Sequence, residues 1–143
     1  MSQTTPDWMS LEAIAALARA DVRRALDEDV GSGDLTAALV PAGRPAPPPG
    51  PGAEAAVICR APWVEATLRA LDPQVQLRWQ VTEGQRCAAD EVVLEAEGDA
   101  RALLSAERTA LNFLQLLSAV ASKTPSYVQA VAGTRPPDVR HPQ

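Results

Sequence analysis

One arginine stands out in a long apolar stretch of the sequence. Residues 100–121 (ARALLSAERTALNFLQLLSAVA) are apolar nearly all round, which is typical of a helix packed on several sides. The polar exceptions follow steps of three and four and so form one narrow seam: Ser105, Arg108, Asn112, Gln115 and Ser118. Leu104 and Leu111 flank Arg108 at about 40° and 60° around the helix axis. The guanidinium of Arg108 is therefore expected to be surrounded by apolar neighbours.

A charge in such a place needs an anion. The guanidinium of Arg108 keeps its proton, and burying it unpaired would cost several kcal/mol. Glu107 is adjacent but points about 100° away. One interpretation is structural: an ion pair with an acid elsewhere in the domain, or a side chain that reaches solvent. The other is functional: a donor fork directed at a ligand's carboxylate or phosphate. The spacing leaves both open.

The N-terminal part of the chain should form a helix over residues 11–26. Its apolar positions recur at steps of three and four: Leu11, Ile14, Ala18, Val22 and Ala25. Ser10 is placed to cap the helix, and Met9 and Ile14 are spaced for a hydrophobic staple. The helix should end by about Asp29, because the VGSGD stretch that follows contains two glycines.

The middle of the chain predicts strands and a short helix. Residues 41–52 (PAGRPAPPPGPG) contain too many prolines for a helix or an interior strand and indicate an exposed loop. A buried strand is expected at residues 55–60, followed by a helix from Pro62 through Leu71. Residues 75–81 alternate apolar with polar side chains, which is typical of a strand with one solvent-exposed face.

A turn at Glu83 and Gly84 should lead to a further strand at residues 92–97. Asp99 is then a suitable N-cap for the helix that starts at residue 100. The expected order is therefore helix, strand, helix, strand, strand, helix, which indicates an α+β domain with a mainly antiparallel sheet.

Composition narrows the function classes. The 143 residues carry a net charge of -5, with a pI near 4.8, which argues against nucleic-acid or anionic-membrane partners. Cys59 and Cys87 lie far apart beside a single His, so neither a zinc site nor a disulfide framework is indicated. No leader peptide or apolar span is apparent, and a cytoplasmic, soluble protein is expected.

Two motifs resemble one enzyme family. The run SAERTALNFLQLLSAVAS at residues 105–122 and the run LDEDVGSGDLTAALVP at residues 26–41 resemble the carboxylating nicotinate-nucleotide pyrophosphorylases, or quinolinate phosphoribosyltransferases. The similarity covers most of residues 10–133. Two departures are the AVAS at residues 119–122, where the family usually has Gly-Ile-Ala-Thr, and a longer proline-rich loop.

The resemblance implies a fold and a reaction. Family members pair an α/β hammerhead-like N-terminal domain with an α/β barrel and form homodimers. They are transferases of NAD biosynthesis that convert quinolinate and phosphoribosyl pyrophosphate to nicotinate mononucleotide, pyrophosphate and CO₂, using Mg²⁺ held by the barrel. Arg108 matches the arginine that reaches across the family's dimer interface to quinolinate. The motif residues Gly31, Gly33, Asp34 and Thr36 are interpreted as turn and capping residues.

The family barrel has no counterpart in this sequence. Residues 1–133 are predicted to be the N-terminal domain, and residues 134–143 a disordered tail in which His141 has no assigned role. A reading-frame change between Thr134 and Asp138 is one interpretation of that tail. We expect the chain to bind no Mg²⁺, to contain no catalytic residue and to be inactive alone.

The sequence leaves two other functions open. A non-catalytic interaction module would use helix 100–121 for self-association. A biotinyl- or lipoyl-type carrier is suggested by the EGQRCAADEVVLEAEG run, but carriers need a lysine at a hairpin tip, and Lys123, the only lysine, lies beyond helix 100–121.

Overall fold

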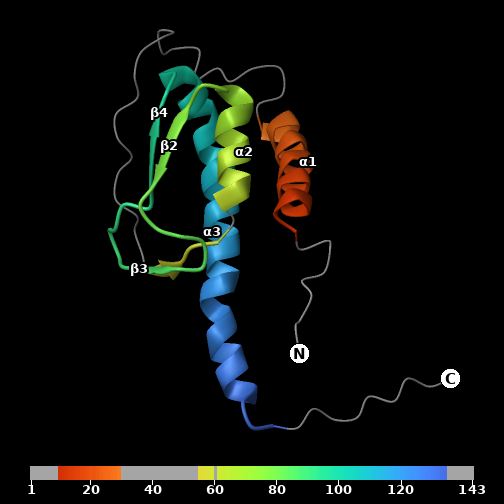
Figure 1. Cartoon of the computed structure of the whole chain (residues 1–143), viewed down its shortest axis with the longest axis vertical. Coiled ribbons are helices and arrows are strands. Elements are labelled where there is room, and N and C mark those ends of the chain that lie inside the picture. Colours follow the sequence, from red (N-terminus) through yellow and green to blue (C-terminus); the bar gives the residue numbers. More distant parts are fainter. Residues whose placement is uncertain (1–9, 30–54, 60, 135–143) are drawn as a thin grey trace, which may run out of the picture.

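The computed structural model describes residues 10–29, 55–59 and 61–134 (Figure 1). The elements in chain order are α1 (Leu11–Asp29), β1 (Ala56–Val57), α2 (Ala61–Leu71), β2 (Gln76–Trp79), β3 (Arg86–Cys87), β4 (Leu94–Glu97) and α3 (Ala100–Val131). The α+β class is confirmed. The proline-rich loop at residues 41–52, Met9 of the predicted staple and residues 135–143 lie outside the described residues.

Local side-chain chemistry starts two of the helices. The Ser10 hydroxyl accepts a hydrogen bond from the backbone N–H of Ala13 at 3.1 Å. The Asp99 carboxylate does the same for Ala102 at 2.9 Å. Each bond satisfies one of the backbone donors that the first turn of a helix leaves free. Both predicted caps are confirmed.

The strands form two separate antiparallel pairs. β2 pairs with β4, with Gln76 opposite Glu97 and Trp79 opposite Leu94. β1 pairs with β3. The predicted alternation is confirmed, because Val75 and Val81 are buried whereas Gln76, Arg78 and Gln80 are exposed.

The strands predicted at 55–60, 75–81 and 92–97 are too long, and β3 was missed. The N–H of Ile58 donates to the carbonyl of Gln85, and the carbonyl of Ile58 accepts from the N–H of Gly84 at the turn. The hydrogen bonds of Ile58 thus go to the turn before β3, and the regular β1–β3 ladder ends at Val57. A two-residue strand such as β3 is too short to carry a period-2 pattern.

The helix predicted at residues 100–121 is also longer than expected. α3 runs on to Val131 through Pro125, and Figure 1 shows its C-terminal part extending beyond the other elements. Proline removes a backbone donor and normally breaks a helix. Here the Thr124 hydroxyl donates to the Val120 carbonyl at 2.8 Å, and the Ser126 hydroxyl donates to the Lys123 carbonyl at 2.7 Å. Both accepting carbonyls lie in the stretch of helix before the proline.

Candidate functional site

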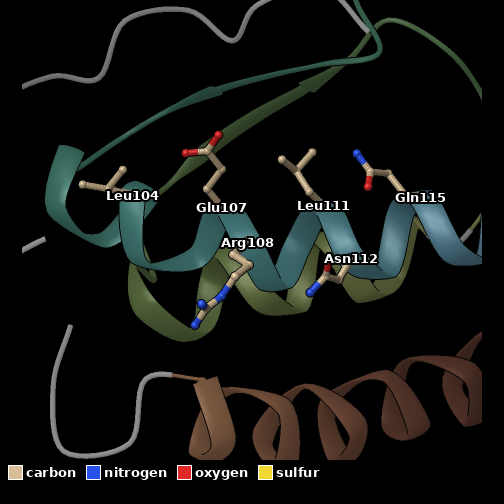
Figure 2. Close-up of a pocket in the computed structure, with 6 residues that line it drawn as sticks. All are labelled: Leu104, Glu107, Arg108, Leu111, Asn112 and Gln115. Carbon is tan, nitrogen blue, oxygen red and sulfur yellow. The ribbon is translucent and has the colours of Figure 1, made fainter. Parts of the chain in front are cut away.

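A shallow hollow of about 330 Å³ lies on the exposed side of α3. Its lining comes from one stretch of that helix: Leu104, Glu107, Arg108, Leu111, Asn112 and Gln115. Figure 2 shows Arg108 and Asn112 leaving α3 on the side of α1, whereas Glu107 and Leu111 leave on the opposite side. The hollow therefore combines one cation and one carboxylate with amides and leucines.

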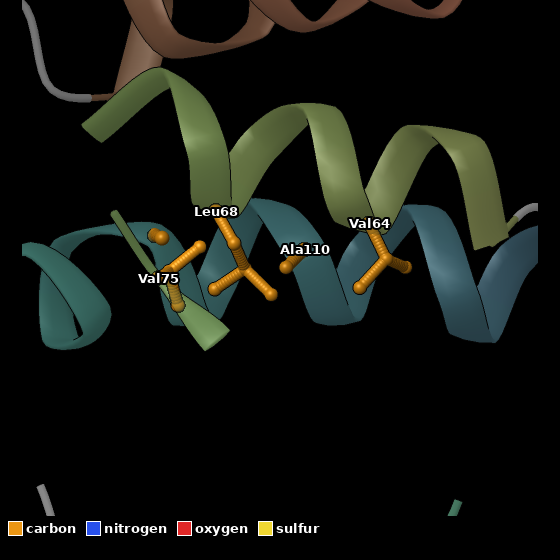
Figure 3. Close-up of a cluster of buried hydrophobic side chains, with 5 residues drawn as sticks. Val64, Leu68, Val75 and Ala110 are labelled. Carbon is orange, nitrogen blue, oxygen red and sulfur yellow. The ribbon is translucent and has the colours of Figure 1, made fainter. Parts of the chain in front are cut away.

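The buried face of α3 decides which side chains reach this hollow. Ala106 and Ala110 belong to one buried cluster with Val64 and Leu68 of α2. Figure 3 shows Ala110, Val64 and Leu68 between the two helices. Alanines allow the two helices to approach closely. Arg108 lies two residues from each alanine and so about 200° around the axis. The packing of α2 on α3 therefore turns Arg108 outward.

The expectation that leucines surround the guanidinium of Arg108 is wrong. Its side chain is 68% exposed, and Leu104 and Leu111 are themselves 37% and 41% exposed. The sequence showed the leucines beside Arg108 but not which face of the helix α2 would cover. Apolar neighbours on an uncovered face do not remove a charge from water.

Arg108 contacts the last residue of α1. Its Nη2 donates to the backbone carbonyl of Asp29 at 3.2 Å and lies 3.5 Å from Oδ1 of the same residue. The structural interpretation, an ion pair with an acid elsewhere in the domain, thus describes the chain as it stands. An exposed pair of this kind contributes about 0.2–1 kcal/mol. Such a weak contact leaves the guanidinium able to bind a second anion.

This cluster also contains Asp29 and Thr109, which are not among the residues predicted from the sequence. The Thr109 hydroxyl donates to Oδ2 of Asp29 at 2.6 Å, and Thr109 is only 2% exposed. One signal was available: the last turn of α1 carries acids and no basic residue, against the helix dipole. The partners lie 79 and 80 residues away, which no local pattern reveals.

The polar seam divides into two parts. Arg108, Asn112 and Gln115 are exposed along the hollow and Ser105 is half-buried, but Ser118 is buried. The Ser118 hydroxyl accepts from the backbone N–H of Cys59 at 3.1 Å. One turn further, Ser122 accepts from the N–H of Val57 at 2.8 Å. The hydroxyls of Ser118 and Ser122 thus attach β1 and the residues after it to α3. The role of these serines is structural.

The remaining candidates give no second site. Gly31, Gly33, Asp34, Thr36 and His141 lie outside the described residues. Cys59 and Cys87 are not joined by a disulfide. Within residues 10–29, 55–59 and 61–134, no three His, Cys, Asp or Glu side chains gather as a metal site would require. None of the described helices is long and apolar enough to cross a membrane.

Comparison with known proteins gives a consistent family. Residues 36–118 match the family described as quinolinate phosphoribosyl transferase, N-terminal domain. A nicotinate-nucleotide pyrophosphorylase (carboxylating) of Mycobacterium leprae is 36% identical over an alignment 125 residues long, which covers 82% of this chain and 43% of the relative. A probable enzyme of the same name from Synechocystis is 38% identical over 79 residues, 55% of this chain and 27% of the relative.

Solved structures agree. The nicotinate-nucleotide pyrophosphorylase of Francisella tularensis superposes with a TM-score of 0.76 at 29% identity. The match covers 83% of this chain and 43% of that protein. The chain thus spans less than half the length of the relatives that it matches.

Proposed function

Because the chain belongs to the quinolinate phosphoribosyltransferase family, we propose that it supplies the N-terminal domain of a carboxylating nicotinate-nucleotide pyrophosphorylase. In the assembled enzyme, Arg108 would bind quinolinate in the site of a partner subunit. The observation that carries this proposal is the guanidinium of Arg108, which projects 68% exposed from a helix whose other face is fixed by α2.

The chemistry of the hollow suits such a ligand. Quinolinate carries two carboxylates on an aromatic ring, and a guanidinium binds a carboxylate through two parallel hydrogen bonds. The half-exposed Leu104 and Leu111 beside Arg108 offer apolar surface that a covering protein could bury. In that setting Arg108 would orient the substrate and balance its charge.

Among the described residues, no three His, Cys, Asp or Glu side chains gather as a dedicated metal site. Mg²⁺ in phosphoryl-group enzymes is usually held by one or two carboxylates together with the phosphates of the substrate. We therefore assign the metal and the transfer of the phosphoribosyl group to another part of the assembly, and give this chain the tasks of binding and assembly.

A chimera tests the proposal. Residues 1–133 fused to the barrel of the Mycobacterium leprae relative should convert quinolinate and phosphoribosyl pyrophosphate to nicotinate mononucleotide in the presence of Mg²⁺. The purified 143-residue chain is the control and should form no product under the same conditions. A folded, dimeric chimera without activity would refute the proposal, and product formation by the chain alone would refute our division of tasks.

A second function has one observation in its favour. Large apolar side chains are exposed along the C-terminal half of α3, as an interaction module would require: Leu116, Val120, Tyr127, Val128 and Val131. The carrier function has none, because Lys123 lies within α3 rather than at a hairpin tip.

A further inference from the structure

Asp29 holds Arg108 and Thr109 through separate atoms. Its Oδ2 accepts the hydrogen bond from Thr109 at 2.6 Å. Its Oδ1 and its backbone carbonyl face Nη2 of Arg108, at 3.5 and 3.2 Å. Because Thr109 is buried and fixes one carboxylate oxygen, the other oxygen is held toward the guanidinium. The side chain of Asp29 thus has a defined orientation although it is 29% exposed.

The position of this acid is unfavourable for α1 itself. The carbonyl end of a helix carries a partial negative charge, and a carboxylate there is repelled. The last turn of α1 also contains Asp27 and Glu28 and no basic residue. Asp27 and Glu28 are exposed, whereas Asp29 is turned onto α3. The stability of α1 does not explain a third acidic residue at this end of the helix. The contacts of Asp29 with α3 are the remaining reason for it among the described residues.

The contact leaves a binding edge of Arg108 available. A guanidinium presents five N–H donors in a planar fork. Among the described residues, Asp29 is the partner of Arg108, and it engages Nη2 alone. The carboxylate therefore restrains a long, rotamer-rich side chain without occupying its fork. Restraint before binding lowers the entropy that a ligand must overcome.

We infer that Asp29 is a positioning residue: it holds the Arg108 guanidinium extended beside α1, so that the free edge of the fork is presented to a carboxylate ligand. The inference rests on the proposed function for the identity of that ligand. The restraint itself is a property of this chain and can be measured on it alone.

The test uses the Nε–H signal of Arg108 in the ¹⁵N NMR spectrum of the full chain, assigned by its loss in Arg108→Lys. In Asp29→Asn, the backbone carbonyl of residue 29 remains but the charge is removed. We expect the order parameter of this Nε–H to fall below about 0.6, the range of flexible groups. Thr109→Val should lower it as well, because the carboxylate loses its anchor. Asp27→Asn, which neutralises an acid of the same helix turn, should leave it unchanged.

A merely structural role predicts a different pattern. If Arg108 only caps the carbonyl end of α1, Asn at position 29 keeps that carbonyl, and the order of Arg108 should match the unsubstituted chain. That result, with backbone amide signals of α1 unchanged in all variants, would overturn the inference. If Asp29→Asn unfolds α1, the Nε–H order parameter of Arg108 in Thr109→Val is compared with that of the unsubstituted chain. Equal values would then overturn the inference.

The two proposals fail separately. The quinolinate KM of the chimera should rise at least threefold in Asp29→Asn while the KM for phosphoribosyl pyrophosphate stays constant. Suppose that the Nε–H order parameter of Arg108 falls in Asp29→Asn, but neither Asp29→Asn nor Arg108→Ala alters the quinolinate KM. Asp29 then restrains Arg108 as inferred, and the proposed ligand of Arg108 is wrong. The opposite outcome is that Arg108→Ala raises that KM while the Nε–H order parameter of Arg108 stays unchanged in Asp29→Asn. That outcome would support quinolinate as the ligand of Arg108 and refute the positioning role of Asp29.

Discussion

At the residue scale, close contacts at the junction before α3 fix the start of that helix and hence the register of Arg108. The Asp72 carboxylate accepts from the backbone N–H of Asp99 at 3.0 Å and from that of Gln74 at 2.9 Å. Gly98 lies directly against this carboxylate. The junction between β4 and α3 therefore depends on a residue without a side chain.

We predict that Gly98→Ala destabilises the chain by about 1–3 kcal/mol, the usual cost of adding a methyl group to a packed site. The new Cβ would collide with Oδ2 of Asp72 and would lie 3.3 Å from Cγ2 of Val75. Urea unfolding measures the loss. In an Asp72→Ala background the same change should cost less than half as much, and an equal cost in both backgrounds would show that the collision is not the cause.

At the element scale, α3 serves as the support for β1. Ser118 and Ser122 accept hydrogen bonds from the backbone of Cys59 and Val57, one helical turn apart. β1 is only two residues long and pairs with an equally short β3. Its ladder is too short to hold it, so the serine hydroxyls on α3 contribute much of its attachment.

Ser118→Ala should therefore lower the free energy of unfolding by about 1–3 kcal/mol, because the hydrogen bond that the buried Ser118 hydroxyl accepts from the N–H of Cys59 is lost. Ser105→Ala is the matched control, since the half-buried Ser105 makes no side-chain hydrogen bond to another described residue. We expect it to be neutral or slightly stabilising, as alanine favours helices. Hydrogen exchange at Cys59 should also accelerate in Ser118→Ala. Equal unfolding midpoints for the two variants would disprove this role.

The same elements show what sequence could and could not predict. The caps at Ser10 and Asp99 and the alternation at residues 75–81 depend on neighbours in the chain, and the structure confirms them. The predicted end of α3 at residue 121 is wrong, because the helix continues through Pro125 to Val131. The surroundings of Arg108 could not be predicted, because they depend on how α1 and α2 pack against α3.

At the scale of the whole molecule, α3 presents an uncovered apolar stripe. Its residues follow steps of four and seven, which places them on one face: Leu116, Val120, Tyr127 and Val131. Each is more than 60% exposed. Contiguous apolar surface of this kind usually marks a contact with another protein.

We predict that the isolated chain self-associates through this stripe in a concentration-dependent way. Light scattering after size-exclusion chromatography should show a mass above 15.1 kDa at high concentration. Val120→Glu should shift the chain to a monomer, because an unpaired charge is costly to bury. Gln129→Glu adds a charge about 200° from Tyr127 on the same helix and should leave the association intact. A monomer at every concentration would contradict the prediction.

We have proposed that Arg108 binds the dicarboxylate substrate in the assembled enzyme. The most direct measurement is the quinolinate KM of the chimera with Arg108→Ala, compared with Arg78→Ala. Arg78 is a matched control, because it is 77% exposed and forms an ion pair at the same 3.5 Å, with Glu95. Arg108→Ala should raise the quinolinate KM at least tenfold, about 1.4 kcal/mol, and leave the KM for phosphoribosyl pyrophosphate unchanged. Equal quinolinate KM values for the two variants would contradict the account.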